Sequence, residues 1–229
     1  MTNIKQLDSS LQTRMDLKRR VTLLRICFAA FIELGETDLE GLAIKKVMAK
    51  AEFAFNTFYN YFGDRETLMA NVIDEIVVPW RAHLIEVQGP FEDEAVKLGF
   101  LMRGWIREFA RDSHFARFSM RNGAFIHKSD SESNRDAVEY FKAGANKGLF
   151  VLPPVESKYL SLGILSASAA LILRERADDS FAERMAERTL VMLGLSEKRA
   201  RAIVEMPMIE IKSLDFIFQK QLEIVSSHL

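Results

Sequence analysis

The residues best suited to chemistry in this chain are hydrogen-bond donors concentrated between positions 43 and 69. The segment reads AIKKVMAKAEFAFNTFYNYFGDRETLM, with lysines near its start and aromatic, amide and hydroxyl side chains in its middle. Amides, hydroxyls and phenols bond phosphate oxygens and base edges, and asparagine can form two hydrogen bonds with one adenine. The segment therefore carries the groups with which proteins contact DNA.

Two short helices joined by a tight turn are predicted to position these donors. The apolar residues of the first helix recur at steps of three and four, so they share one face: Ile44, Val47, Met48 and Ala51. The lysines fall on or near the opposite face: Lys45, Lys46 and Lys50. The pattern breaks over residues 52–54, and Phe58 and Phe62 then form the apolar stripe of a second helix. This arrangement is a helix-turn-helix.

The segment resembles the DNA-binding head of TetR-type transcriptional regulators. In that family the second and third helices end in a T-F/L-Y-x-Y/H-F/V string, followed by a Lys-Glu or Arg-Glu pair. This chain has TFYNYF at residues 57–62 and then Arg65 and Glu66. The resemblance implies an all-α fold, in which an N-terminal three-helix helix-turn-helix head precedes a larger helical ligand-binding and dimerisation body.

The turn of the motif departs from the family pattern. Glu52 stands where the family usually has Gly, and Ala54 stands where it usually has a Ser or Thr that caps the recognition helix. A residue other than Gly is sterically disfavoured where φ must be positive, and a missing cap typically costs about 1 kcal/mol. Asn56 replaces the family's small residue before Thr57. We therefore expect a head with unusual turn chemistry that reads an atypical site.

The resemblance also implies roles for individual side chains of the head. Five of them would hold phosphates and fix the register on the duplex: Arg19, Arg20, Thr57, Tyr59 and Arg65. Two lysines would lie close to the DNA backbone: Lys45 and Lys46. Three residues would face the bases: Phe55, Asn56 and Asn60. Asn56 can bond an adenine, and Phe55 can press on a thymine methyl group.

Length and composition fit a helical protein of one or two domains. Hydrophobic residues make up 48% of the 229 positions, and 11 Gly and 5 Pro leave little room for loops. The net charge of −1 does not by itself indicate a nucleic-acid partner. We divide the chain into a flexible N-terminal arm (1–13), a TetR-type helix-turn-helix DNA-binding domain (14–63, with its motif at about 44–63) and a helical ligand-binding and dimerisation domain (64–229, beginning with a connecting helix at 64–78).

No signal peptide or membrane span is predicted, so we expect a cytoplasmic protein. The first twenty residues are polar and charged. The most apolar run, residues 159–173, is shorter than the roughly 20 residues that a span needs. Cys27 is the only cysteine of the sequence, which excludes a disulfide within one chain and suits a reducing cytosol. Cys27 lies in an apolar stripe, which favours burial over redox sensing.

Punctuating residues predict where the helices begin and end. The first helix is expected at about 14–34, followed by Gly35 as its cap. Asp64 is expected to cap the fourth helix, and Pro79 is expected to kink or shorten that helix. The remaining segments are expected as helices at about 92–111, 115–126, 135–146, 155–177, 180–194, 197–204 and 208–227, with a loop at 129–134.

The helices at about 155–177 and 180–194 are expected to form a homodimer contact. The first has small residues that would let another helix approach closely: Gly163, Ser166, Ala167, Ser168, Ala169 and Ala170. Ser180 and Glu183 match a capping box for the second. In the family that the chain resembles, two such helices pair with their twofold mates, whereas the alternative is packing within one chain. The helix at 208–227 either covers the body or extends the dimer contact.

Aromatic residues crowd the middle of the body. They are Trp105, Phe109, Phe115, Phe118, Phe125, Tyr140 and Phe141. The resemblance implies a cavity for a small apolar or aromatic effector, and five residues are the candidates to line it: Trp105, Phe109, Phe118, Phe125 and Phe141. The alternative is plain core packing. Few charges lie among these residues, which favours an apolar ligand over a polyanionic one.

A catalytic function is not predicted. The four histidines are scattered without metal-ligand spacing, and no Gly-rich phosphate loop or nucleophile elbow is present, so no metal or cofactor is expected. Arg103, Arg107 and Arg111 form a ladder along one helix that could hold an anion, although a solvated helix face explains it more simply.

Together these features favour a ligand-responsive, DNA-binding transcriptional regulator. We predict a repressor that binds a near-palindromic operator as a homodimer and is released by a small apolar or aromatic effector. The alternative is an all-α dimeric small-molecule-binding protein whose head does not read DNA. The departures at Glu52 and Ala54 keep this alternative open.

Overall fold

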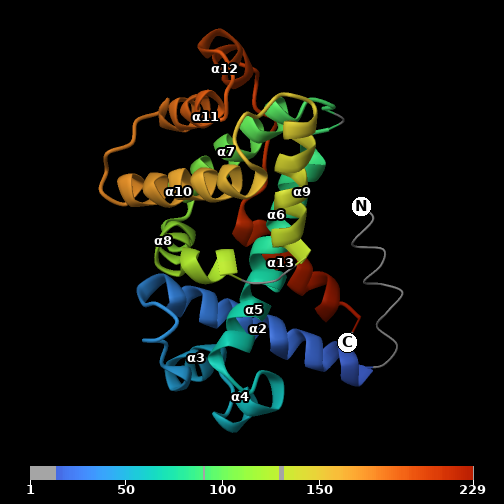
Figure 1. Cartoon of the computed structure of the whole chain (residues 1–229). Coiled ribbons are helices and arrows are strands. Elements are labelled where there is room, and N and C mark those ends of the chain that lie inside the picture. The colour runs from blue at the N-terminus through green and yellow to red at the C-terminus, as the bar shows by residue number, and fades with distance from the viewer. Residues whose placement is uncertain (1–13, 90, 129–131, 229) are drawn as a thin grey trace.

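The computed structural model describes residues 14–89, 91–128 and 132–228, with the backbone alone described at residues 14, 124–128 and 132–136. Within these ranges the chain is helical and contains no β-strand (Figure 1). The all-α class predicted from the sequence is confirmed. The predicted N-terminal arm, residues 1–13, lies outside the described residues. No described helix is both long and apolar enough to cross a membrane.

Among the described residues, three helices form the head, at the lower end of Figure 1. They are α2 (Arg14–Glu36), α3 (Ile44–Ala51) and α4 (Asn56–Tyr61). Their buried side chains meet in one cluster that includes Leu24, Val47, Met48, Phe58 and Phe62. Because the apolar stripes of α3 and α4 face this cluster, their polar residues are left on the outer surface of the head, as the periodicity predicted.

The first helix does not end at the predicted cap. It continues through Gly35 to Glu36. Gly35 lies where the start of α8 approaches, because a Cβ atom at this position would lie 3.3 Å from the carbonyl oxygen of His114. Asn122 of α8 reinforces this contact by donating to the Leu34 carbonyl oxygen at 2.9 Å. The glycine therefore permits close helix packing and does not terminate the helix.

A continuous helical segment connects the head to the body. It consists of α5 (Arg65–Val72), one π-helical turn η1 (Ile73–Val77) and α6 (Val78–Val87). Asp64 caps α5 as predicted, because its carboxylate accepts a hydrogen bond from the Thr67 amide at 2.7 Å. Pro79 does not end the helix. The wider turn just before it, in which the Val78 amide bonds the Ile73 carbonyl five residues back, keeps the segment helical.

The body is arranged around α7 (Glu94–Arg111). Besides α6, five described helices pack closely against it: α8 (Ser113–Lys128), α9 (Glu132–Asn146), α10 (Pro154–Ile172), α11 (Phe181–Met192) and α12 (Glu197–Val204). The helix predicted at 197–204 is confirmed. α10 ends at Ile172, earlier than expected, because the chain turns back at Glu175, which has a left-handed φ of 55°. α9 already begins at Glu132, so part of the predicted loop at 129–134 is helical, since polar residues do not exclude a helix.

The capping box predicted for α11 is not formed. The Ser180 hydroxyl accepts no capping hydrogen bond from the backbone of α11 and instead donates to the Asp178 carboxylate at 3.0 Å. Glu183, the other half of the predicted box, lies 3.2 Å from Arg103 and 2.5 Å from Arg107 of α7. The Glu183 carboxylate pairs with these two guanidinium groups and does not turn back to Ser180.

The arginine ladder of α7 is structural. Arg103 is buried and donates to the Met206 carbonyl oxygen at 2.9 Å, and Arg111 donates to the Ile211 carbonyl oxygen at 3.1 Å. These contacts hold the irregular segment that follows α12 against α7. The predicted solvated face holds for Arg107 and Arg111, which are exposed, and not for Arg103. The ladder pairs with groups of the chain itself, since Arg107 also contacts the Glu183 carboxylate.

The last helix covers the junction between the head and the body. α13 (Leu214–Ser226) begins later than the predicted residue 208, because the preceding segment is tied to α7 and the Ser213 hydroxyl caps the helix by accepting from Phe216 at 3.1 Å. α13 packs against α2, η1 and α6. Phe218 stacks on Phe28 of α2, with ring centroids 4.5 Å apart and planes 10° apart.

Candidate nucleic-acid interface and internal cavity

The outer face of α4 presents aromatic and amide groups to solvent. Phe55 is 38% exposed and Tyr59 is 58% exposed, although their rings touch edge to face at 5.6 Å. Asn56 and Asn60 are also exposed, and Thr57 is half-buried. Large aromatic rings that remain exposed beside amides are unusual on a solvated helix and are suited to contact a partner.

The basic residues of the head differ in what they contact. Lys45 and Lys46 of α3 and Arg65 at the start of α5 are exposed. The Arg19 guanidinium lies over the ring of Tyr61, 5.5 Å from its centroid. Arg20 instead points toward the connecting segment and pairs with the Glu75 carboxylate through both of its terminal nitrogens.

The turn between α3 and α4 requires a positive φ at Glu52, where the family usually has Gly. Glu52 has φ 63° and ψ 37°, the left-handed region in which glycine is normal, and this costs roughly 1–2 kcal/mol for other residues. Arg25 of α2 supports the turn. Its guanidinium is 2.7 Å from the Glu52 carboxylate and lies over the Phe53 ring. Both charged groups are largely exposed, so the pair offsets only part of the cost.

The start of α4 has no side-chain cap. No side chain accepts a hydrogen bond from its first amides, and the Thr57 amide bonds the Ala54 carbonyl at 3.0 Å. A serine or threonine at position 54 would supply the missing acceptor. The head therefore forms its helix-turn-helix, with strain in the turn and an uncapped second helix, as the two departures predicted.

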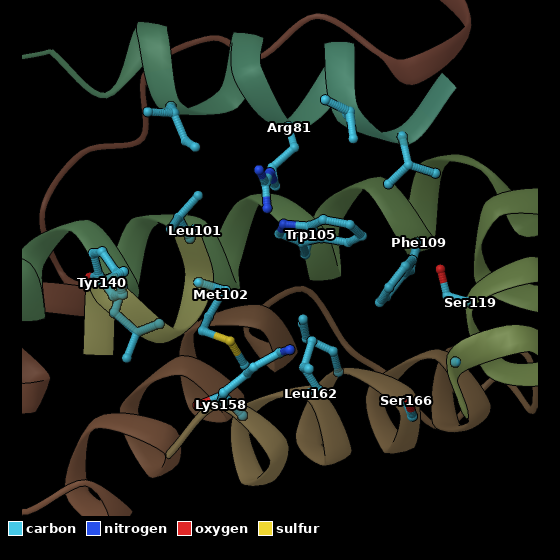
Figure 2. Close-up of a pocket in the computed structure, with 18 of the residues that line it drawn as sticks. Arg81, Leu101, Met102, Trp105, Phe109, Ser119, Tyr140, Lys158, Leu162 and Ser166 are labelled. Atoms are coloured by element: carbon cyan, nitrogen blue, oxygen red, sulfur yellow. The ribbon is translucent and has the colours of Figure 1, made fainter. Parts of the chain in front are cut away.

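The body contains a cavity of about 300 Å³ that is partly open to solvent, which we call the central cavity (Figure 2). Its walls come from η1, α6, α7, α8, α9 and α10. Most of the lining is apolar and includes Ile73, Val77, Leu101, Met102, Trp105, Phe109, Phe115, Phe141, Leu162 and Leu165. A largely apolar cavity with a few polar groups is the usual form of a small-molecule site.

The candidate ligand residues meet the central cavity only in part. Trp105, Phe109 and Phe141 line it. Phe118 does not, because it packs toward the head against Phe31 at 5.1 Å. The side chain of Phe125 lies outside the described residues. Phe115, which the sequence placed only in the aromatic crowd, is a wall residue within ring-contact distance of Trp80, Trp105 and Phe109.

Polar groups of the central cavity were not found from the sequence. Lys158 of α10 is 5% exposed and lines the cavity, and none of the described carboxylates pairs with it. Burial lowers the pKa of Lys158. The hydroxyls of Ser119 and Ser161 are buried at the wall without a hydrogen-bond partner. The only sequence signal was that Lys158 immediately precedes the uncharged run 159–173.

The η1 turn belongs to the cavity wall and also contacts the head. Ile73 and Val77 line the cavity. Glu75, between them, accepts hydrogen bonds from Arg20 of α2 and, at 3.2 Å, from Gln221 of α13. A change in the cavity that displaced this turn would therefore act directly on the residue that holds α2.

Other reactive groups have structural surroundings. Cys27 is fully buried, and burial raises the pKa of its thiol far above the ordinary value, as befits a small hydrophobic residue. Among the described residues, no group of three histidine, cysteine or acidic side chains is placed to hold a metal ion.

Comparison with known proteins reveals relatives by structure. No protein-family model and no curated protein sequence matches the chain. RolR in complex with resorcinol is similar with a TM-score of 0.63 and 24% identity, over 85% of this chain and 98% of that chain. The fatty acid degradation regulator FadR from Bacillus halodurans has a TM-score of 0.57 and 17% identity, over 75% and 98% of the two chains.

A further similar structure is a TetR-like transcriptional regulator from Rhodococcus sp. RHA1, with a TM-score of 0.53 and 15% identity over 78% of this chain and 94% of that one. At these identities the likeness is one of fold. The chain therefore has the fold of TetR-like regulators, and the architecture implied by its sequence resemblance is confirmed at that level.

Proposed function

We propose that this chain is a ligand-responsive, DNA-binding transcriptional regulator. The observation that carries the proposal is the exposed face of α4, with its aromatic and amide groups, on a head that η1 joins to a cavity-bearing body. The fold shared with TetR-like regulators supports it. We expect repression of a near-palindromic operator, release by a small effector and no enzymatic activity.

The head residues would divide between bases and phosphates. Phe55, Asn56 and Asn60 would face base edges, where each good bidentate contact is worth about 1–3 kcal/mol of discrimination. The phosphate contacts would come from Arg19, Thr57, Tyr59 and Arg65, with Lys45 and Lys46 close to the backbone. Arg20 would have to leave Glu75 to join them, so we assign it to the contact between the head and η1.

A homodimer would place two such heads on one duplex. The outer face of α10 supports this contact, because its apolar residues are exposed in the single chain: Val155, Tyr159, Leu160 and Leu171. Gly163 and Ala167 lie on the same face and would let a second α10 approach closely. Most side chains of α11 are buried or half-buried within the single chain. α10 would therefore supply more of the interface than α11.

The dimer proposal predicts that a large side chain at Gly163 separates the protomers. A Cβ at this position meets no atom within 4 Å, so Gly163→Met fits the single chain and favours the helix by about 1 kcal/mol. Between two close helices it would clash. Sedimentation velocity of Gly163→Met is expected to give monomers, while Lys142→Met on α9 stays dimeric. An unchanged dimer would exclude this face.

The proposed function is tested by selection from a randomised duplex pool at two salt concentrations. Enrichment of a near-palindrome, with affinity that falls steeply as salt rises, is the expected result. Asn56→Ala should then relax the sequence preference, whereas Arg65→Ala should weaken all duplexes alike. An unchanged preference for Asn56→Ala would retire its assignment to a base.

The second candidate is a dimeric small-molecule-binding protein whose head does not read DNA. The left-handed Glu52 and the uncapped α4 favour it, because both lower the stability of the helix that would enter the major groove. A folded dimer that enriches no duplex in the same selection would decide for this candidate.

A further inference from the structure

We propose that the central cavity binds a monoanionic amphiphile, a small molecule with an aromatic or aliphatic body and one carboxylate, and that Lys158 and Ser161 bind the carboxylate. The inference deepens the proposed function and rests on its effector site. It specifies the chemical class of the effector. The aromatic lining alone indicates only that the effector is apolar.

The cavity is built for an apolar body. Trp105, Phe109 and Phe115 form one side of it, and aliphatic residues of η1 and α10 form much of the rest. The ring of Tyr140 also lines it, but the Tyr140 hydroxyl is already used, since it donates to the Glu94 carbonyl oxygen. A ligand without any polar group would fill this space and leave the buried donors at its edge without hydrogen-bond partners.

Lys158 is the buried donor whose charge most needs a compensating partner. It is 5% exposed, and Figure 2 shows its side chain directed from α10 into the cavity, between Met102 and Leu162. A buried ammonium group is costly unless an anion or acceptors compensate it. The described chain supplies only the ring of Tyr159, whose centroid is 5.4 Å from the ammonium nitrogen. A bound carboxylate would complete the compensation.

Ser161 stands beside Lys158 and is also without a partner. Residues three apart share one face of a helix, so the two side chains leave α10 on the same side. Two other buried serines of α10 bond the backbone: Ser157 donates to the Leu152 carbonyl oxygen at 3.2 Å, and Ser168 donates to the Ile164 carbonyl oxygen at 2.7 Å. Ser161 is 4% exposed, and its hydroxyl has no hydrogen-bond partner, neither a backbone carbonyl nor another group. It can donate to the same carboxylate.

The charge of the lining selects for an anion. Lys158 contributes a positive charge to the lining, and none of the described residues that line the cavity is acidic. Charges beside apolar side chains interact more strongly than charges in water. With Lys158 and Ser161 as the adjacent uncommitted donors, one carboxylate is matched, whereas a polyanion would bring more charge into an apolar space than these donors compensate.

Matched ligand pairs test the inference by isothermal titration calorimetry. The probes are 4-phenylbutanoate with 4-phenylbutan-1-ol, and octanoate with octan-1-ol. We expect each acid to bind the full-length protein at least tenfold more tightly than its alcohol. Lys158→Met, which keeps the length of the side chain without its charge, should remove that preference by weakening the binding of the acids. Ser161→Ala should reduce it several-fold, and Lys142→Met on the exposed face of α9 should leave it intact.

The outcomes separate this inference from the proposed function. Alcohols that bind as well as acids would overturn the carboxylate site but keep an apolar effector cavity. A preference for acids that survives Lys158→Met would place the anion elsewhere and also overturn it. Absence of binding by both members of both pairs, to a protein that still selects an operator, would reject the ligand class alone. Acid binding by a protein that enriches no duplex would support the inference and reject the regulator.

Discussion

The head and the central cavity are built in opposite ways. The head gathers its recognition groups from one stretch of sequence, on short helices that are strained at Glu52 and uncapped at Ala54, and it leaves aromatic rings in solvent. The cavity gathers its groups from six helical segments and buries them. Side chains of the head are therefore expected to contribute to binding more than to stability, whereas side chains of the cavity wall must contribute to both.

The largest expected difference is between two phenylalanines. Phe115 is fully buried among Trp80, Trp105 and Phe109, so Phe115→Ala should lower the free energy of unfolding by about 3–5 kcal/mol. Phe55→Ala, on the exposed face of α4, should change it by less than about 0.5 kcal/mol. Urea denaturation measures both. Similar losses for the two variants would break the comparison.

The contact between the two regions should have an intermediate effect. Glu75 is 12% exposed at its side chain and holds Arg20 of α2, so Glu75→Gln should cost about 1–3 kcal/mol of unfolding free energy. The matched control is Glu139→Gln, which removes an exposed pair with Lys142 and should cost less than about 1 kcal/mol. Denaturant titration distinguishes them. Equal costs would mean that the Glu75 cluster does not join the head to the body.

The smallest expected effect concerns the missing cap, and it is a gain. Ala54→Ser supplies an acceptor for the free amides at the start of α4 and should raise the unfolding free energy by about 1 kcal/mol. The same substitution at exposed Ala49, within α3, should lower it by about 0.5 kcal/mol, because serine is a poorer helix former. Thermal melts of both variants test this. No gain at position 54 would indicate that the start of α4 is satisfied in another way.

This contrast also explains which features the sequence could predict. The helices of the head followed from local periodicity, and Asp64 from its place before an apolar stripe. The cavity wall depends on contacts between distant segments, which local periodicity does not show. Phe118 packs against Phe31 of the head, whereas Phe115 lines the cavity. No local pattern shows that Glu183 will meet Arg103, 80 positions away, in preference to its neighbour Ser180.

The charged groups show the same limit. The sequence contains Arg20 and Lys158 but does not reveal their surroundings. Arg20 lies beside the exposed basic residues of the head, yet its partner Glu75 is 55 positions away. Lys158 lies beside exposed Tyr159, yet its own side chain is buried. Whether a basic residue faces solvent, a carboxylate or a cavity is decided by helix packing, which periodicity resolves only to one face of a helix.

The contacts of α13 and of the segment just before it bear on the order in which the chain folds. Gln221 reaches Glu75 across 146 positions, and Trp80 donates to the Lys212 carbonyl oxygen across 132. Contacts between such distant positions require closure of a long loop, and proteins rich in them fold slowly. α2 can pack on α3 and α5 early, since these neighbours follow it closely in the chain. Its stacking with α13 through Phe28 and Phe218 is expected late, so the head would acquire its final orientation only after the body has formed.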